Sequence, residues 1–178
     1  MTAGDIDSGV VIADAGPLIA LSRIERLSLL HDLFDRVHLT EIVRQEVMDG
    51  GRFDDATLIQ QAIVDGWLVV EPLSDTHPIL TPSGLDAGEI SSISWALARR
   101  EMGAQSLLII DDASARTVAM HLKLPIVGTA GVIGRAKQAG LIAQAAPLLR
   151  RLPEVGYFVA PGIIEAVLRQ VGELPQRS

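Results

Sequence analysis

Acidic residues stand in this chain where strands should end or helices should begin. They are Asp14, Glu46, Glu89, Asp111 and Asp112. The carboxyl ends of parallel strands converge on one crevice of a sheet. Carboxylates gathered in such a place repel one another and stay ionised together only if a cation lies among them. The pattern therefore predicts a divalent-metal site, and with it chemistry on phosphate esters.

The first two acids also have simpler structural explanations. Asp14 follows the apolar run Val10–Ala13 directly and could cap the turn that begins at Gly16. Glu46 could belong to a solvated helical face. Its neighbours Val43 and Val47 are apolar at helical spacing, however, and this favours a position near the buried edge of the helix.

The remaining acids divide differently between capping and chemistry. Asp86 and Glu89 have the spacing of a capping box, with Asp86 as the cap and Glu89 at the third helical position. Asp111 and Asp112 are adjacent at the end of a wholly apolar strand. A helix needs only one of them as its cap, so the other is free to face the crevice, and the sequence does not decide which.

The elements that must position these acids alternate along the chain. Short strands are expected at Val10–Ala13, Arg36–Leu39, Trp67–Val70, Leu107–Ile110 and Pro125–Val127. Helices are expected as two short segments between Leu18 and Leu30, and at Glu41–Met48, Asp54–Asp65, Leu85–Met102, Asp112–Leu122 and Thr129–Ala139. This alternation predicts an α/β fold, a three-layer α/β/α sandwich with a mainly parallel five-stranded sheet. The strand Leu107–Ile110 is expected to be the most central.

The alternation of strands and helices ends after Gly140. A helix is expected at Ala143–Arg151, an extended segment at Tyr157–Val159, and a helix at Ile163–Val171 whose apolar stripe packs either on the domain or on a partner. We expect a single domain over residues 1–178, with a core at about 10–141 and a helical extension at about 142–178.

Composition limits the function further. The 178 residues carry 22 acidic and 15 basic side chains, a net charge of −7, so no large basic face for nucleic acid is implied. The aromatic content of 3% predicts no aromatic platform for stacking bases. The absence of cysteine excludes disulfides and thiolate metal sites. Residues 1–9 are not expected to form a signal peptide and no apolar run is long enough to span a membrane, so cytoplasmic residence is expected.

Two further residues have phosphate-binding chemistry. Thr129 opens a helix after the fifth strand, where free amides can bind phosphate, and its hydroxyl could hold a phosphate, a metal-bound water or simply cap the helix. Arg116 stands four residues after Asp112, so it could form an intrahelical ion pair or contact phosphate.

Four segments together resemble the PIN-domain family, and most closely a branch related to VapC-type toxins. They are Val-Ile-Ala-Asp14-Ala-Gly-Pro-Leu, the helix from Glu41 through Glu46 to Val47, Leu85-Asp-Ala-Gly-Glu89, and Ile-Ile-Asp111-Asp112-Ala-Ser-Ala-Arg116. The resemblance runs from about Val10 to Leu141. It implies a ribonuclease dependent on Mg²⁺ or Mn²⁺, often the toxin of a toxin–antitoxin pair and often a homodimer.

The resemblance also assigns the acids. The family's acids carry over to Asp14, Glu46, Glu89, and either Asp111 or Asp112. The sequence departs from the family pattern in having Glu89 where many toxins have Asp. It also has Ala15 and Gly16 where a small hydroxyl or amide residue commonly follows the first acid.

The expected function is metal-dependent hydrolysis of RNA. Asp14, Glu89 and Asp112 are expected to bind the metal, with Asp111 as the alternative to Asp112. Glu46 is expected to bind a second metal or to position the attacking water. One alternative is a catalytically weak or inactive PIN-like interaction module, supported by the apolar stripe near the carboxyl terminus and the low basic charge.

Another alternative is a receiver domain with a phosphoryl-accepting aspartate. Such a site needs paired acids after the first strand and a lysine at the end of the fifth. Only Asp14 and Gly128 stand at these two places.

Overall fold

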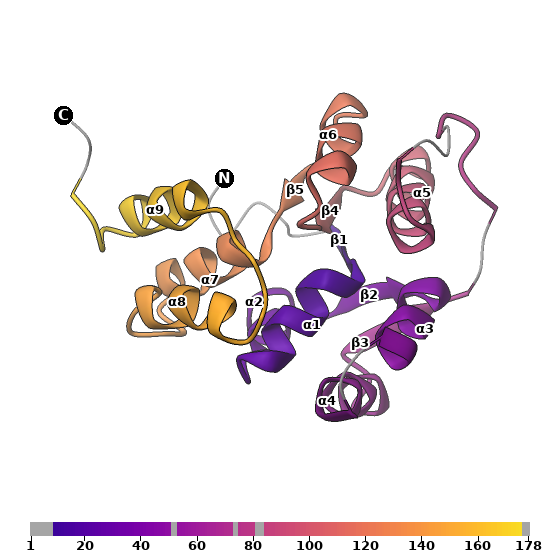
Figure 1. Ribbon diagram of the computed structural model, residues 1–178. Helices are drawn as coiled ribbons and strands as arrows, with labels where there is room; N and C mark the ends of the chain where they lie inside the picture. The colour runs from indigo at the N-terminus through magenta and orange to yellow at the C-terminus, as the bar shows by residue number, and fades with distance from the viewer. Residues whose placement is uncertain (1–8, 51–52, 73–74, 81–83, 176–178) are drawn as a thin grey trace.

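The fold is that of a computed structural model, which describes residues 9–50, 53–72, 75–80 and 84–175. Residues 1–8, which include most of the segment expected not to be a signal peptide, lie outside this description. Five strands form one sheet in the order β3-β2-β1-β4-β5, and every neighbouring pair is parallel. The strands are β1 (Val10–Ala13), β2 (Val37–Thr40), β3 (Leu68–Glu71), β4 (Ser106–Ile109) and β5 (Ile126–Val127). The predicted α/β/α sandwich is confirmed (Figure 1).

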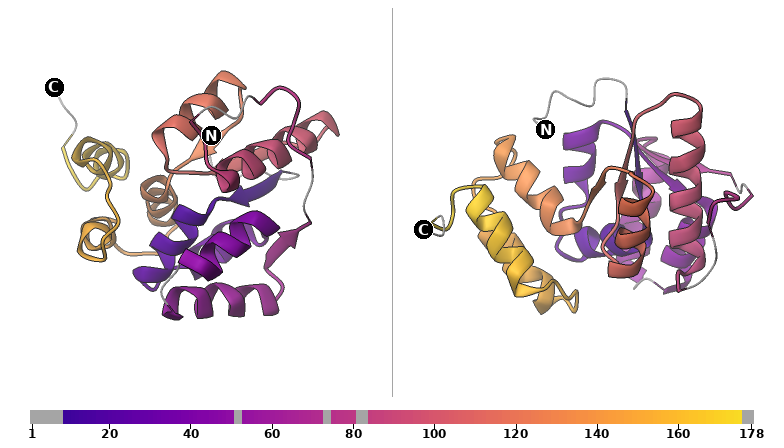
Figure 2. Two further views of the ribbon diagram at one scale, coloured as in Figure 1. Left: turned by 45° about the vertical axis from the view of Figure 1, so that its right-hand side comes forward. Right: turned by 90° about the horizontal axis from the view of Figure 1, so that it is seen from above.

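The helices cover both faces of this sheet. They are α1 (Ala15–Arg23), α2 (Ser28–Phe34), α3 (Glu41–Gly50), α4 (Phe53–Val64), α5 (Ala87–Glu101), α6 (Ala113–His121), α7 (Thr129–Gln138), α8 (Ala146–Glu154) and α9 (Pro161–Gln170). Alternate residues of a strand point to opposite faces, so each inner strand contributes to both cores. Val11 and Leu107 join the core under α1, α2 and α7, while Ile12 and Leu108 join the core under α5 and α6. The two views of Figure 2 show these helices on either side of the sheet.

The strand order reverses at β1, and this places the crevice. β1 has β2 on one side and β4 on the other, whereas the chain runs to β2 and β3 first and to β4 and β5 later. Open α/β sheets bind ligands outside the carboxyl ends of the strands at such a switch point. The expectation that Leu107–Ile110 is the most central strand is wrong, because β1 is central and β4 lies between β1 and the short edge strand β5.

Local capping explains where two helices begin. The hydroxyl oxygen of Thr40 accepts a hydrogen bond from the Val43 amide at 3.2 Å, so Thr40 caps the start of α3. Before α7 the capping position belongs to Gly128, and Thr129 is the first helical residue. The expectation that Thr129 could be a simple N-cap is therefore wrong.

The carboxyl-terminal helices pack on the rest of the domain. Val167 and Leu168 of α9 are buried, and a Cβ at Gly134 of α7 would lie 2.8 Å from a Val167 methyl carbon, so the glycine lets the two helices approach closely. The apolar stripe of α9 is thus used largely inside the domain, and Ile163 at its start stays 50% exposed. Tyr157–Val159 connect α8 to α9 without joining the sheet. In the described part of the chain, no helix has the length and apolar character needed to cross a membrane.

Candidate functional site

Asp14 lies at the switch point, immediately after β1. Its amide donates to the Ile109 carbonyl oxygen at 3.0 Å, so the backbone is held by β4, and the residue takes the N-cap position of α1. The carboxylate makes no capping hydrogen bond to that helix and is only 8% exposed. The capping explanation for Asp14 therefore fails, and its burial needs another reason.

The pKa of Asp14 reports an unfavourable environment for a negative charge. The pKa rises from 3.8 to about 7, mainly because the carboxyl is buried and then because of the charges of Asp86, Glu46 and Glu89 in that order, against a smaller opposing effect of the Ala15 amide. The hydroxyl of Ser92 donates to Oδ1 at a long 3.4 Å. A carboxyl held among other carboxyls in this way gains most from a bound cation.

Glu46 reaches this group from α3. Its Oε1 accepts the Gly88 amide at 2.9 Å, and a Cβ at Gly88 would lie 2.2 Å from Oε2. Burial and the charge of Asp86 raise the pKa of Glu46, while the Gly88 hydrogen bond lowers it. Glu46 thus points at the start of α5 and not at solvent, which contradicts the solvated-face explanation.

Glu89 serves the capping box and belongs to the acidic group at once. Its Oε2 accepts the Asp86 amide at 2.9 Å, and the Asp86 carboxylate accepts the Glu89 amide at 2.8 Å. The box is therefore confirmed. Burial raises the pKa of Glu89, and the charges of Asp86, Asp112 and Glu46 raise it as well. The acids therefore influence one another across α3, α5 and the end of β4.

Asp112 caps α6 at the edge of this group. Its Oδ1 accepts the amides of Ser114 at 2.8 Å and Ala115 at 2.9 Å. The side chain is exposed, and its charge contributes to the raised pKa of Glu89. Asp112 thus caps α6, and its charge also acts on an acid of the group.

Asp111 is held by three donors and turns towards the carboxyl-terminal segment. It accepts the Thr129 amide at 3.0 Å, the Thr129 hydroxyl, and the Tyr157 hydroxyl at 2.7 Å. A Cβ at Gly128 would lie 2.5 Å from Oδ1, so this arrangement requires glycine there. Thr129 is fully buried and its hydroxyl is occupied by Asp111, a placement that does not support a phosphate contact.

Tyr157 is a site residue that the sequence did not reveal. Burial raises the pKa of its phenol, and the charge of Asp111 raises it further, so the hydroxyl stays protonated and donates to Asp111. A Cβ at Gly16 would lie 3.1 Å from the phenol oxygen, so the small residue after Asp14 leaves room for the tyrosine. No local sequence pattern indicates that Tyr157 belongs to the site, because it lies 46 residues along the chain from Asp111.

Two other members were present in the sequence but not assigned to the site. Asp86 was recognised only as a cap, yet its charge raises the pKa values of Asp14, Glu46 and Glu89. Ser92 lies one helical turn after Glu89 on the same face of α5, and that spacing was the available signal.

The donor chemistry of the acidic group fits a hard divalent cation. Across the described residues, no three Asp, Glu, His or Cys side chains come together closely enough to hold an ion among them. Mg²⁺ keeps several of its waters, however, and is commonly bound through one or two carboxylates. Burial and the neighbouring carboxylates together raise the pKa of Asp14, and a bound cation would relieve both effects. Asp14 and Glu89, with Asp112 at the edge, are the side chains suited to hold it.

Arg116 lies beside the same strand ends. Its Nη1 donates to the Ile110 carbonyl oxygen at 2.9 Å. The intrahelical ion pair with Asp112 is therefore not what this side chain forms. The same nitrogen would lie 3.1 Å from a Cβ at Gly128, which places the guanidinium next to Asp111.

Comparison with known proteins agrees with this architecture. The model of the family DUF3368, described as a PIN domain, matches residues 10–173, a range that includes α8 and α9. Among solved structures, the chain is similar to a PilT N-terminus domain protein from the hyperthermophilic archaeon Sulfolobus solfataricus. The identity is 18%, with 69% of this chain and 89% of that chain covered and a TM-score of 0.48. No match was found among curated proteins.

Proposed function

We propose that this chain, which belongs to the PIN-domain family DUF3368, is a divalent-metal-dependent ribonuclease. The fold is of a nuclease type, and RNA as substrate and Mg²⁺ or Mn²⁺ as the ion are the proposal. The observation that carries it is the buried Asp14 carboxyl, whose pKa is raised to about 7 among three further acids. A bound cation would offset the cost of keeping this carboxylate charged in a buried place.

The residues would divide the work by position. Asp14 and Glu89 would hold the cation from β1 and α5, and Asp112 would complete the site from β4. Asp111 is less suited, because Thr129 and Tyr157 already occupy its oxygens. The cation would supply charge neutralisation at the scissile phosphate and a water of lowered pKa.

Glu46 is proposed to orient that water or to bind a second ion. Its Oε1 is fixed by the Gly88 amide, which leaves Oε2 to accept a hydrogen bond from a water at the site. Burial and the charge of Asp86 raise the pKa of Glu46, and a carboxyl with a raised pKa is better able to take a proton near neutrality.

The finer family role is a separate proposal. The resemblance to VapC-type proteins suggests the toxin of a toxin–antitoxin pair, bound by an antitoxin and acting as a homodimer. Expression of the chain would then arrest growth, and expression of Asp14→Asn would not. Growth unaffected by an active, metal-dependent enzyme would contradict the toxin role and leave the nuclease proposal intact.

The alternative of an inactive interaction module has less support. Its main argument was the apolar stripe of α9, and the buried Val167 and Leu168 of that stripe pack on α7. The low basic charge is its remaining argument, and Asp14 is not explained by it.

Cleavage of mixed cellular RNA tests the proposal. Purified protein is compared with Asp14→Asn in Mg²⁺, in Mn²⁺ and in chelator. Asp32→Asn, which changes an exposed aspartate on α2, is the matched control. We expect cleavage that requires the ion, is lost in Asp14→Asn and is kept in Asp32→Asn. Cleavage that survives both chelator and Asp14→Asn would contradict it.

A further inference from the structure

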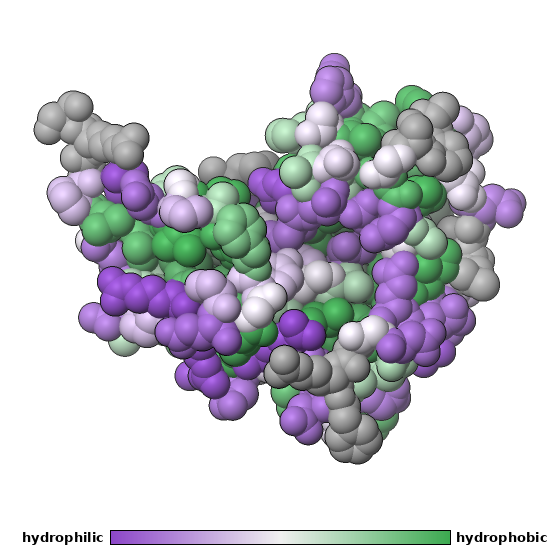
Figure 3. All heavy atoms as spheres, in the orientation of Figure 1, coloured by the Kyte–Doolittle hydropathy of each residue, from purple (hydrophilic) through white to green (hydrophobic). Residues whose placement is uncertain are grey.

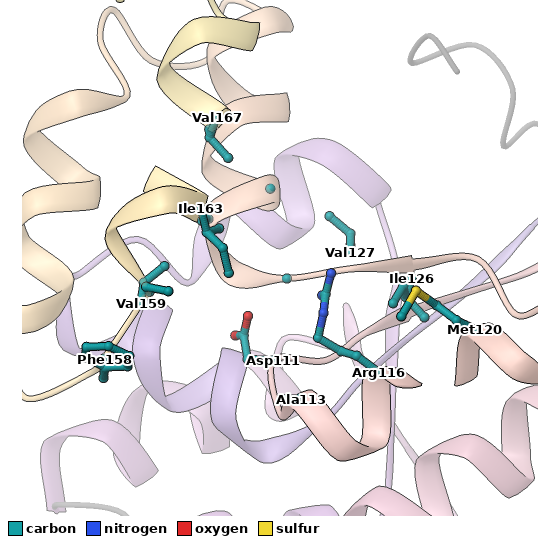
Figure 4. A pocket seen from close by; sticks show the side chains of 14 residues that line it. Asp111, Ala113, Arg116, Met120, Ile126, Val127, Phe158, Val159, Ile163 and Val167 are labelled. Atoms are coloured by element: carbon teal, nitrogen blue, oxygen red, sulfur yellow. The ribbon is translucent and has the colours of Figure 1, made fainter. Parts of the chain in front are cut away.

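A pocket of about 560 Å³ lies between the sheet and the carboxyl-terminal segment. α6, β5 and the start of α7 form one side, and the segment from Phe158 into α9 forms the other (Figure 4). Figure 3 shows the molecule hollowed between α9 and α6, with hydrophobic side chains on the α9 side and a mixture of hydrophobic and hydrophilic ones opposite. Its volume is in the range of small-ligand sites.

The walls of the pocket have distinct chemistry. Val127, Val159 and Ile163 form an apolar wall, while Arg116 and Asp111 stand at the polar side. Figure 4 shows the Arg116 side chain extended between these two sides. One of its nitrogens donates to the Ile110 carbonyl, so the guanidinium keeps further donors for a ligand.

Large apolar side chains remain exposed at the pocket. Phe158 is 81% exposed, Met120 56% and Ile163 50%. Exposed apolar groups gathered at a concave site mark a place where a ligand is bound.

We propose that this pocket binds a nucleobase of single-stranded RNA next to the bond that is cut, with Arg116 contacting the adjoining phosphate. The inference rests on the proposed ribonuclease function. Asp111 lines the pocket, and Asp112 lies at the edge of the acidic group. Because these two residues are consecutive, the pocket and the acidic group are next to each other. A strand lying across the acidic group therefore reaches the pocket with its neighbouring nucleotide.

Charge and shape select this occupant. Among the described residues that line the pocket, the one basic side chain is an arginine, which can bind phosphate oxygens through paired hydrogen bonds. The apolar wall and the Phe158 ring suit the flat face of a base, and stacking of this kind tolerates every base. The subsite would therefore bind single strands with little sequence preference and would not accept a base held in a duplex.

Binding is tested in chelator, where the proposed cleavage does not occur. The probe is a fluorescein-labelled, six-nucleotide 2′-O-methyl RNA, measured by fluorescence anisotropy beside the same backbone with abasic positions. We expect Phe158→Ala to weaken binding of the base-bearing probe by about 5-fold or more and to leave abasic binding unchanged. Val64→Ala, at an exposed apolar position on α4, is the matched control and should bind both probes as the unaltered chain does.

Arg116 is tested with the same two probes. Arg116→Ala should weaken both, because a phosphate contact does not depend on the base, and Arg116→Lys should recover part of the loss. Equal binding of base-bearing and abasic probes by the unaltered chain would overturn the proposal. The proposal would also be overturned if Phe158→Ala bound both probes as the unaltered chain does. It would be overturned as well if Phe158→Ala differed from the unaltered chain only in its self-association on size exclusion.

The binding and cleavage assays together distinguish the proposed base-binding pocket from the proposed ribonuclease function. Base-dependent binding that is lost in Phe158→Ala, in a protein that cuts no RNA, would support the pocket and contradict the ribonuclease proposal. The opposite result is metal-dependent cleavage together with base-dependent binding that is unchanged in Phe158→Ala. It would support the ribonuclease proposal and overturn the proposed base-binding pocket.

Discussion

Replacing Asp14 with asparagine should stabilise the metal-free protein while abolishing its response to metal. The carboxyl is buried beside Glu46, Asp86 and Glu89, so its ionisation is unfavourable in the folded state. Asparagine keeps nearly the same shape and an oxygen at the position that accepts from Ser92, and it removes the charge. Few substitutions at a functional centre are expected to raise stability, which makes this one informative.

The size of the effect follows from the pKa. A rise from 3.8 to about 7 corresponds to roughly 4 kcal/mol, at about 1.4 kcal/mol per unit. The folded pKa lies above the unfolded value, so the folded state keeps a proton that the unfolded state has lost. The free energy of unfolding of the metal-free protein therefore falls as pH rises from about 4 to about 7, and the full penalty remains above that.

The assay is denaturation in chelator across this range. At pH 8 we expect Asp14→Asn to unfold at a temperature on the order of 10 °C higher than the unaltered protein. The difference should shrink towards zero near pH 4. Addition of Mg²⁺ or Mn²⁺ at 100 times its dissociation constant should stabilise the unaltered protein by about 2.7 kcal/mol and leave Asp14→Asn unchanged. Asp32→Asn should match the unaltered protein throughout.

Two results would refute this reasoning. If Asp14→Asn were less stable than the unaltered protein in chelator at pH 8, the carboxylate would have favourable partners that outweigh its repulsion. If the stability difference did not change between pH 4 and pH 7, the effect would not arise from the charge of Asp14.

Three other changes test single contacts at the site. Gly88→Ala places a Cβ 2.2 Å from the Glu46 carboxylate, so we expect it to displace that side chain and cut the cleavage rate at least 10-fold, as read in a single-turnover assay. Tyr157→Phe removes the hydroxyl that donates to Asp111 and should lower the free energy of unfolding by about 1–3 kcal/mol in urea denaturation; an unchanged midpoint would show that the bond contributes nothing. Asp112→Asn keeps a good N-cap but loses the charge, so the free energy of unfolding should change by less than about 1 kcal/mol while metal-dependent cleavage falls. If stability and cleavage fell together, Asp112 would be assigned to capping alone.

The local elements were predictable because their signals lie within short windows. The apolar run before Asp14 indicated β1, and the spacing of Asp86 and Glu89 indicated the cap of α5. The alternation of strands and helices then predicted a parallel sheet, and parallel strands bring their carboxyl ends to one edge. The acids could be assigned to a common crevice on that ground alone.

The exact partners depended on contacts between distant segments. Glu46 meets Gly88 only because α3 packs against the start of α5, and the repulsion felt by Asp14 includes Asp86, whose sequence pattern indicated nothing beyond a cap.

The different partners of Asp111 and Asp112 likewise depend on the tertiary structure. The connection between α8 and α9 brings Tyr157 to Asp111, while Asp112 keeps its charge beside Glu89. The sequence by itself determined most of the elements, their order and the positions of the acids that follow the strands. Only the tertiary structure decided which carboxylates remain open and where a pocket forms beside them, since both depend on side chains that packing brings together from remote parts of the chain.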